Sequence, residues 1–347
     1  MAIYIFVSTS SDYHVFSKNI TSAKELGIEL HTSYLSQFDS VEGELKEGDI
    51  LVTRNLGGLS FNKESLEKMN RVSHKKNLPF ICLPGYKNDD PSILSLSTAP
   101  VPVCQKLFSY YEACHSNHIL ESLKYLSDLY CGTSLGWQEP ERFPEFGFLP
   151  GYENLDRIKQ ARIANKKIIA ILLYRTHYLA DDIQPIQQLI EEIEALGSVV
   201  MPLYCSMMKQ PQDEIHPVEK YLVDEKGVPF PHVIIDCLSY ATVDVSTTGS
   251  VTEGGNDLKG LFARLNIPVL HALYCSESES QWRENKKGMS PRDMGMKVVL
   301  PEFDGKIIAH PIGFVEESIL KGQPISQYQG NEERVKSLVG LANRFAA

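Results

Sequence analysis

The chain has 347 residues, of which 43% are hydrophobic and 22% are charged, as in ordinary water-soluble globular proteins. A formal net charge of -10 argues against a nucleic-acid-binding surface, which needs a basic field. No apolar run is long enough to span a membrane, and the N-terminus has no basic segment typical of an export signal. The length favours two domains, because it exceeds what one hydrophobic core usually organises.

The seven cysteines indicate a reducing compartment. Their number is odd, no pair has the C-x-x-C spacing, and several lie in apolar runs such as PFICLPG and HVIIDCLSY. We therefore expect buried, reduced thiols in a cytoplasmic protein.

Strands and helices alternate through the first part of the chain. The segments AIYIFV, IELHTSYL, DILVTRNLGG and LPFICLPG predict strands, with helices over residues 16–27 and 63–76. The acidic stretch SVEGELKEGD is predicted to be a linker. Residues 103–130 have apolar positions at helical spacing and predict one long helix. The following segment, WQEPERFPEFGFLPGYENL, contains three prolines and predicts an irregular connection.

The same alternation returns after the connection. KKIIAILLYR, SVVMPLYC, PHVIIDCLSY and IPVLHALYC predict strands, IQPIQQLIEEIEALG and NDLKGLFARLN predict helices, and MKVVLPEFDGKIIAHPIGF predicts a closing strand and turn. The predicted fold class is α/β, with two doubly wound (Rossmann or flavodoxin-like) parallel-sheet domains and a helical connection. The predicted boundaries are 1–150 and 166–330 for the domains, 151–165 for the linker, and 331–347 for a terminal helix leading into a missing downstream region.

Candidate binding residues follow the predicted strands. Ligands of open α/β sheets bind beyond the carboxyl ends of the strands. That rule selects the segment YRTHYLADD after the strand that begins at Ile168, the segment SES after PVLHALYC, and LPEFDG near the closing strand. The predicted ligand-binding residues are Arg175, His177, Tyr178, Asp181, Ser276 and Glu302; Asp182, Thr242, Glu277, Ser278 and Asp304 lie in the same segments or the loop after VIIDCLSY.

The stretch around Arg175 has two interpretations. In extended chain, Arg175 and His177 would share one face, where the arginine could clamp a carboxylate and the histidine could exchange a proton or bind a metal. Alternatively, the segment is a polar helix entry in which Arg175 pairs with Asp181 or Asp182.

Other motifs predict structure rather than chemistry. TTGSVTEGGND lacks the glycine and lysine order of a phosphate-binding loop, and no G-x-G-x-x-G or G-x-S-x-G motif occurs, so a solvated glycine-rich loop is expected. His115 and His118 stand three residues apart without an obvious third ligand, which favours a structural pair over a metal site. No catalytic or metal-ligating residue is predicted.

Several ordered segments carry a family resemblance. The chain resembles the large subunit of ATP-dependent cobaltochelatase (CobN type) in eight segments that occur in the same order. They are DILVTRNLGG, LSTAPVPVCQKLFSYYEACHSNHILESLKYLSDLY, PEFGFLP, IAILLYRTHYLADDIQPIQQLIEEIEALG, VMPLYC, LNIPVLHAL, SESQWRENKKGMSPRDMGMKVVLPEFDGKI and PIGF. The large subunit of magnesium chelatase is a more distant relative. YYEACHSNH and LADD depart from the glycine-containing versions of these segments in the family, which affects ligand contacts more than the fold.

The resemblance implies a function. It implies the N-terminal part of a subunit that holds a corrin precursor while cobalt is inserted during cobalamin synthesis, with AAA+-type partner subunits that use ATP and Mg²⁺. Arg175 would suit the tetrapyrrole carboxylates, and His177 or Glu302 the polar contacts. The metal-inserting region of the family lies further downstream, so no cofactor is expected on this piece. A stand-alone tetrapyrrole or metal-cofactor binding module and a nucleotide-sugar transferase are the alternatives.

Overall fold

The computed structural model describes residues 2–56, 58–85, 92–112, 115–141, 143–206, 216–239, 260–285, 288–320 and 323–347. Contacts within the chain define two units. Unit 1 comprises Met1–Phe143, Leu179–Asp182 and Glu317–Gln327. Unit 2 comprises Pro144–Tyr178, Ile183–Glu316 and Tyr328–Ala347.

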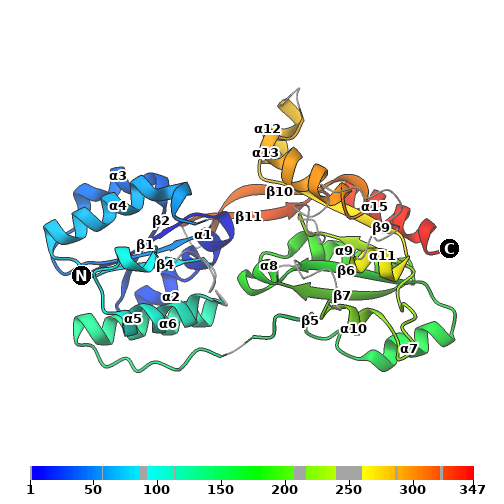
Figure 1. Cartoon of the computed structure of the whole chain (residues 1–347), viewed down its shortest axis with the longest axis horizontal. Helices are drawn as coiled ribbons and strands as arrows, with labels where there is room; N and C mark the ends of the chain where they lie inside the picture. The colour runs from blue at the N-terminus through cyan, green and yellow to red at the C-terminus, as the bar shows by residue number, and fades with distance from the viewer. Residues whose placement is uncertain are drawn as a thin grey trace, which may run out of the picture. The chain divides into compact units, whose positions relative to one another are not determined.

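Unit 1 is built on a parallel sheet of four strands in the order β2-β1-β3-β4 (Figure 1). The strands are β1 (Ala2–Val7), β2 (Glu29–Tyr34), β3 (Ile50–Asn55) and β4 (Phe80–Pro84). β1, β3 and β4 are buried along their whole length, as expected for apolar strands covered on both faces. The four strands were predicted correctly from their apolar runs.

Helices cover both faces of this sheet. One core contains side chains of α1 (Ser10–Ser17), α2 (Ile20–Glu25), α5 (Val101–Tyr111) and α6 (Ser116–Cys131). The other contains side chains of η1 (Leu35–Gln37), α3 (Phe38–Val41) and α4 (Leu59–Lys76). Figure 1 shows α3 and α4 on the face opposite α5 and α6. Two short 3₁₀ turns complete the unit, η2 (Glu42–Glu44) and η3 (Leu94–Leu96).

Two predicted helices are each divided in two. The predicted helix over residues 16–27 covers the end of α1 and all of α2, and the two helices are separated after Ser17, where the Asn19 side chain donates to the Val15 carbonyl (2.7 Å) and competes with regular helical pairing. The predicted helix over residues 103–130 is divided into α5 and α6. His115 starts α6, since its Nδ1 accepts the Asn117 N–H (3.3 Å) as an N-cap.

Unit 2 contains a mixed sheet of seven strands in the order β11-β10-β9-β8-β6-β7-β5. The strands are β5 (Phe146–Phe148), β6 (Ile168–Tyr174), β7 (Val199–Cys205), β8 (Val233–Asp236), β9 (Val269–Cys275), β10 (Ile307–Leu320) and β11 (Gln323–Gly330). The adjacent pairs β10–β9, β9–β8, β8–β6 and β6–β7 are parallel, whereas β5 is antiparallel to β7. The prediction of a purely parallel sheet is wrong at this edge, because a three-residue strand between prolines gives too short a pattern to recognise.

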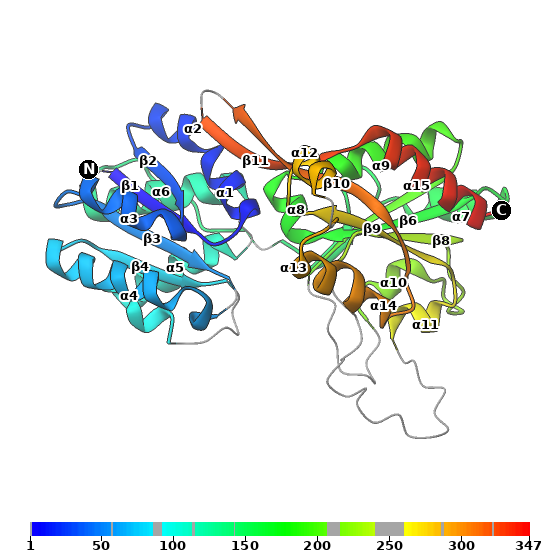
Figure 2. The same cartoon turned by 90° about the horizontal axis from the view of Figure 1, so that it is seen from above.

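The helices of unit 2 also cover both faces of the sheet. α9 (Gln184–Ala195) and α15 (Glu332–Phe345) pack on one face. α7 (Leu155–Ile163), α10 (Glu219–Leu222) and α11 (Leu261–Leu265) pack on the other. Figures 1 and 2 show α15 running beside α9. The remaining helices are α8 (Arg175–Ala180), α12 (Glu279–Glu284), α13 (Pro291–Met294), the π-helical turn η4 (Gly295–Val299) and α14 (Leu300–Glu302).

The segment MKVVLPE is helical, although the sequence predicted a closing strand there. It forms η4 and α14, and the strand β10 begins only at Ile307. An ion pair between Asp293 and Lys297, four residues apart (2.9 Å), supports the helical conformation. The valines at 298 and 299 had suggested a strand, so a local charge pair and tertiary packing override the β-branched pattern.

The described cysteines fit the prediction of buried, reduced thiols with one exception. Five are buried and free (Cys82, Cys104, Cys205, Cys237 and Cys275), and burial raises the pKa of each thiol. Cys131, at the end of α6, is exposed instead. Cys114 lies outside the described residues. Among the described helices, none is long and apolar enough to cross a membrane.

Candidate functional site

The candidate site lies where β6 and β9 end. β6 stops at Tyr174, and α8 begins with the next residue, so Arg175 and His177 stand on a helix. Of the two interpretations, the extended segment with both side chains on one face is therefore wrong. Residues two apart on a helix point in different directions, about 200° apart around the axis. Each of the two residues consequently has its own set of contacts.

His177 packs among tyrosine rings. Its ring lies 5.3 Å from that of Tyr328, nearly parallel, and 5.6 Å and 6.1 Å from Tyr174 and Tyr274. Tyr274 and Tyr328 themselves meet edge to face at 5.0 Å. Burial, with the Lys297 ammonium nearby, lowers the pKa of His177 to about 4. At neutral pH this ring is an uncharged imidazole that can accept or donate a hydrogen bond.

A polar triad of Ser276, Asp293 and Lys297 adjoins the aromatic residues. Ser276 follows β9 directly, and its hydroxyl lies 2.7 Å from the Lys297 Nζ and 2.9 Å from an Asp293 oxygen. The Ser276 backbone N–H donates to the other Asp293 oxygen (2.9 Å). Burial would raise the pKa of Asp293, but hydrogen bonds from Lys297 and Ser276 lower it overall. The triad therefore presents an ammonium and a hydroxyl held in fixed positions beside Tyr274 and His177.

Gly313 makes room for the Tyr274 ring. It pairs with Tyr274 across β9 and β10, and a Cβ at Gly313 would lie 2.9 Å from that ring. We expect Gly313→Ala to displace the ring and to lower the free energy of unfolding by about 1–3 kcal/mol. Gly340→Ala on α15 is the control, since a Cβ there meets nothing within 4 Å, and it should stabilise by about 0.5–1 kcal/mol. Denaturant-induced unfolding measures the free energy of unfolding of both variants. If the two substitutions change it equally, Gly313 is not needed to make room for the Tyr274 ring.

Arg175 and Tyr178 make mainly internal contacts. Arg175 is buried, and its Nε donates to the Pro144 carbonyl (2.9 Å). The Tyr178 ring stacks on Tyr204 with 4.8 Å between centroids. Both residues thus connect α8 to other parts of unit 2, beside the aromatic residues around His177.

Asp181 and Glu302 are not brought together with the other predicted residues. Asp181 belongs to unit 1, has a left-handed backbone (φ 56°), and forms an ion pair with Lys18 at 3.2 Å. Glu302 is exposed at the end of α14, and no hydrogen bond or ion pair joins its carboxylate to another described residue. The structure thus groups His177 with Ser276, but not with these two carboxylates.

A buried charged network lies at the carboxyl end of β8. Lys306 pairs with Asp236 at 2.8 Å and with Asp304 at 3.2 Å, and all three side chains are at most 1% exposed. The His271 Nδ1 lies 3.3 Å from the Asp236 carboxylate. Of these four residues, only Asp304 was predicted from the sequence to lie near the ligand-binding edge. An acid at the last position of the strand VIID was the available signal, because strand-end acids of α/β sheets lie at the ligand-binding edge.

Three further predictions concern loops and histidines. The glycine-rich segment TTGSVTEGGND (residues 247–257) and Thr242 lie outside the described residues. His115 caps α6, and the buried His118 accepts the Glu141 backbone N–H at Nε2 (3.1 Å), so the pair has the structural role that was predicted. Ser278 caps α12 and Asp182 is buried. Within the described ranges, no group of three His, Cys, Asp or Glu side chains could hold a metal ion.

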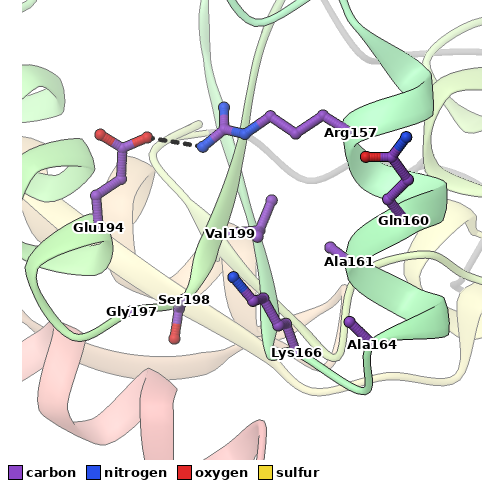
Figure 3. Close-up of a pocket in the computed structure, with 9 residues that line it drawn as sticks. All are labelled: Arg157, Gln160, Ala161, Ala164, Lys166, Glu194, Gly197, Ser198 and Val199. Atoms are coloured by element: carbon purple, nitrogen blue, oxygen red, sulfur yellow. Dashed lines mark hydrogen bonds and ion pairs between the residues drawn. The ribbon is translucent and has the colours of Figure 1, made fainter.

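A cavity at the amino ends of β6 and β7 differs from this site. Its volume is about 520 Å³, and its lining comes from α7, the end of α9 and the residues before the two strands. Figure 3 shows Arg157 and Glu194 facing one another from α7 and α9, as an ion pair of 3.0 Å. The pair neutralises the main charges, and the cavity lies opposite the edge where sheets of this kind bind ligands. We therefore place the candidate site at the carboxyl ends of the strands.

Comparison with known proteins relates the chain to subunits of metal chelatases. The chain is 25% identical to the aerobic cobaltochelatase subunit CobN of Pseudomonas aeruginosa, over 88% of the chain and 24% of the relative. It is 26% identical to the magnesium-chelatase subunit ChlH of Oryza sativa, over 52% of the chain and 12% of the relative. An uncharacterized protein of Methanocaldococcus jannaschii is 28% identical to the chain, over 98% of the chain and 29% of the relative.

The family profile and a solved structure agree. Residues 108–347 match the CobN/magnesium chelatase family, and the chain belongs to this family. The catalytic subunit of cobaltochelatase from Mycobacterium tuberculosis has a similar fold, with a TM-score of 0.64 and 22% identity over 99% of the chain and 27% of that protein. The chain thus spans less than a third of the length of these relatives.

Proposed function

We propose that this chain is the N-terminal part of an ATP-dependent cobaltochelatase large subunit, and that it contributes to binding a corrin precursor in the cytoplasm. The observation that carries the proposal is the grouping of His177, Tyr274 and Tyr328 beside the Lys297 ammonium. A macrocycle with carboxylate side chains needs apolar, flat contacts for its ring and cations for its periphery. The aromatic residues supply the first, and Lys297, whose charge Asp293 partly balances at 2.9 Å, supplies the second.

His177 would act in positioning rather than in metal insertion. Because its pKa is about 4, the imidazole is uncharged at neutral pH and adds no second positive charge beside Lys297. A neutral ring stacked near Tyr328 can offer a flat face and one hydrogen bond to a bound ring. We assign the removal of the pyrrole protons and the insertion of cobalt, the substrate metal, to regions of the relatives beyond this chain.

The partners in the proposal are AAA+-type ATPase subunits, which would use ATP and Mg²⁺. The family membership supports this part, since the relatives carry the name of subunits of multi-component chelatases. A stand-alone tetrapyrrole-binding module would bind the macrocycle but not these subunits. Size-exclusion chromatography of the chain mixed with purified ATPase subunits separates the two.

A titration tests the tetrapyrrole site. We expect a metal-free carboxylated corrin to bind saturably, with a shift of its visible absorbance, and Tyr328→Ala to weaken binding at least fivefold by removing a ring that stacks near His177. Tyr125→Ala in unit 1 is the matched control, because Tyr125 is also half-buried and packs against an aromatic ring, that of Trp137. Absence of saturable binding, or equal loss in both variants, would remove the site assignment.

A further inference from the structure

A second cavity lies on the other face of the unit 2 sheet. It has a volume of about 720 Å³ and lies between α7 and the segment over residues 220–230. Its neighbours belong to the core that contains α7, α10 and α11, whereas His177 is surrounded by rings of the core that contains α9 and α15. The cavity is therefore separate from the candidate tetrapyrrole site, and its volume is in the range of small-molecule sites.

The floor of the cavity is apolar. Leu155 contributes from α7, Ile163 of the same helix lies at the rim, and Val223 and Phe230 contribute from the opposite wall. Ile163 is 86% exposed, more than any other large apolar side chain among the described residues. A solvent-exposed isoleucine at the rim of an apolar hollow provides surface that a bound apolar group would remove from water.

Cations surround this floor. Lys159, Arg162, Lys220 and Lys226 line the cavity together with only two carboxylates, those of Asp224 and Glu225, so the lining has a net charge of +2 in a chain of net charge -10.

One of the four cations is fixed in place. Arg162 pairs with Asp224 at 3.0 Å, and its guanidinium lies over the Phe230 ring at 5.7 Å. No ion pair joins Lys159, Lys220 or Lys226 to a carboxylate within the part of the chain that the structure describes. The Lys220 ammonium lies over the Tyr221 ring at 4.9 Å. Lys159 and Lys226 thus remain to bind an anion at the rim of the cavity, whereas Arg162 and Phe230 form part of its wall.

We propose that this cavity binds an amphipathic organic carboxylate, with its apolar body on Ile163 and Phe230 and its carboxylate at Lys159 and Lys226. The chemistry follows from the lining: an apolar floor disfavours inorganic phosphate alone, and the net positive rim disfavours a neutral or cationic ligand. This site is independent of the proposed tetrapyrrole site.

Two fluorescent probes that differ only in charge test the proposal, namely 1-pyrenebutyrate and its uncharged amide. The anion should bind saturably and at least fivefold more tightly than the amide at low salt, and the difference should shrink at high salt as the charges are screened. Lys159→Gln/Lys226→Gln should weaken the anion at least fivefold and change the amide less than twofold. Ile163→Asn should weaken both probes, since it removes apolar surface.

Lys24→Gln/Lys75→Gln is the control, because it removes the same charge from exposed positions of unit 1. The side chains substituted in the cavity variants and in this control are exposed, and circular dichroism verifies that the variants fold. Equal binding of anion and amide, undiminished binding by the cavity variants, or an equal loss in the control each overturns the proposal. Tyr328→Ala should leave pyrenebutyrate binding unchanged, which separates a failure here from a failure of the tetrapyrrole site.

Discussion

Replacing Lys306 by methionine should lower the free energy of unfolding by about 3–5 kcal/mol, because it leaves two buried carboxylates without their counter-charge. Asp236 and Asp304 both pair with this ammonium, and neither side chain is more than 1% exposed. The pairing offsets the desolvation of Lys306 and raises its pKa overall, so the lysine stays charged inside the protein. Denaturant-induced unfolding at neutral pH measures the loss.

Two further variants make this prediction specific. Lys166→Met removes an exposed lysine of the same unit and should change the free energy of unfolding by less than about 0.5 kcal/mol. Asp236→Asn combined with Lys306→Met should be less destabilised than Lys306→Met alone, since one of the unpaired charges is removed. If Lys306→Met lowers the free energy of unfolding by less than about 1 kcal/mol, water enters the network or the surrounding structure relaxes around the two carboxylates, and the prediction is wrong.

Lowering the pH from 7 to 5 should destabilise the protein by several kcal/mol, on the order of 5 in total, through three histidines. Burial lowers the pKa of His14, His177 and His216 to about 4, with Lys18, Lys297 and Arg264 respectively adding to the effect. Their ordinary pKa of 6.5 applies in the unfolded chain. Between pH 6.5 and 4 the unfolded chain therefore binds more protons, and stability is lost as the pH falls through this window.

Unfolding of single-histidine variants at both pH values checks the assignment. His14 is 3% exposed, and neither of its ring nitrogens has a hydrogen-bond partner among the described residues. His14→Leu should therefore stabilise the protein at pH 7 by about 1–3 kcal/mol and remove its share of the pH dependence. His74→Gln, at an exposed position, should leave the dependence unchanged. A wild-type stability that is the same at pH 7 and pH 5 would contradict the prediction.

Local sequence patterns predicted most of the elements. β3 and β6 are short apolar runs of the kind typical of buried strands. α15 begins after a capping residue, Asn331, and its apolar residues then recur at helical spacing. The errors fall where the pattern is short or ambiguous. β5 has three residues, and the valines before α14 suggested a strand although the segment is helical.

The candidate site was predicted only in part. Its strand-end position was predicted from the carboxyl-end rule, and His177 and Ser276 do lie next to the aromatic residues and the triad. Tyr274 and Lys297 were not predicted, because the rule selects loops and these residues stand on a strand and a helix. The extended interpretation of Arg175 and His177 also failed, because both residues stand on the helix α8.

The sequence by itself determined the α/β class and the family, since apolar runs, glycine turns and ordered motifs are properties of short segments. Only the tertiary structure decided which charges meet. Lys306 reaches Asp236, and Lys297 reaches Ser276, across separations along the chain that no periodicity encodes. The physical reason is that the order of strands in the sheet, rather than the order of residues in the chain, selects which side chains become neighbours.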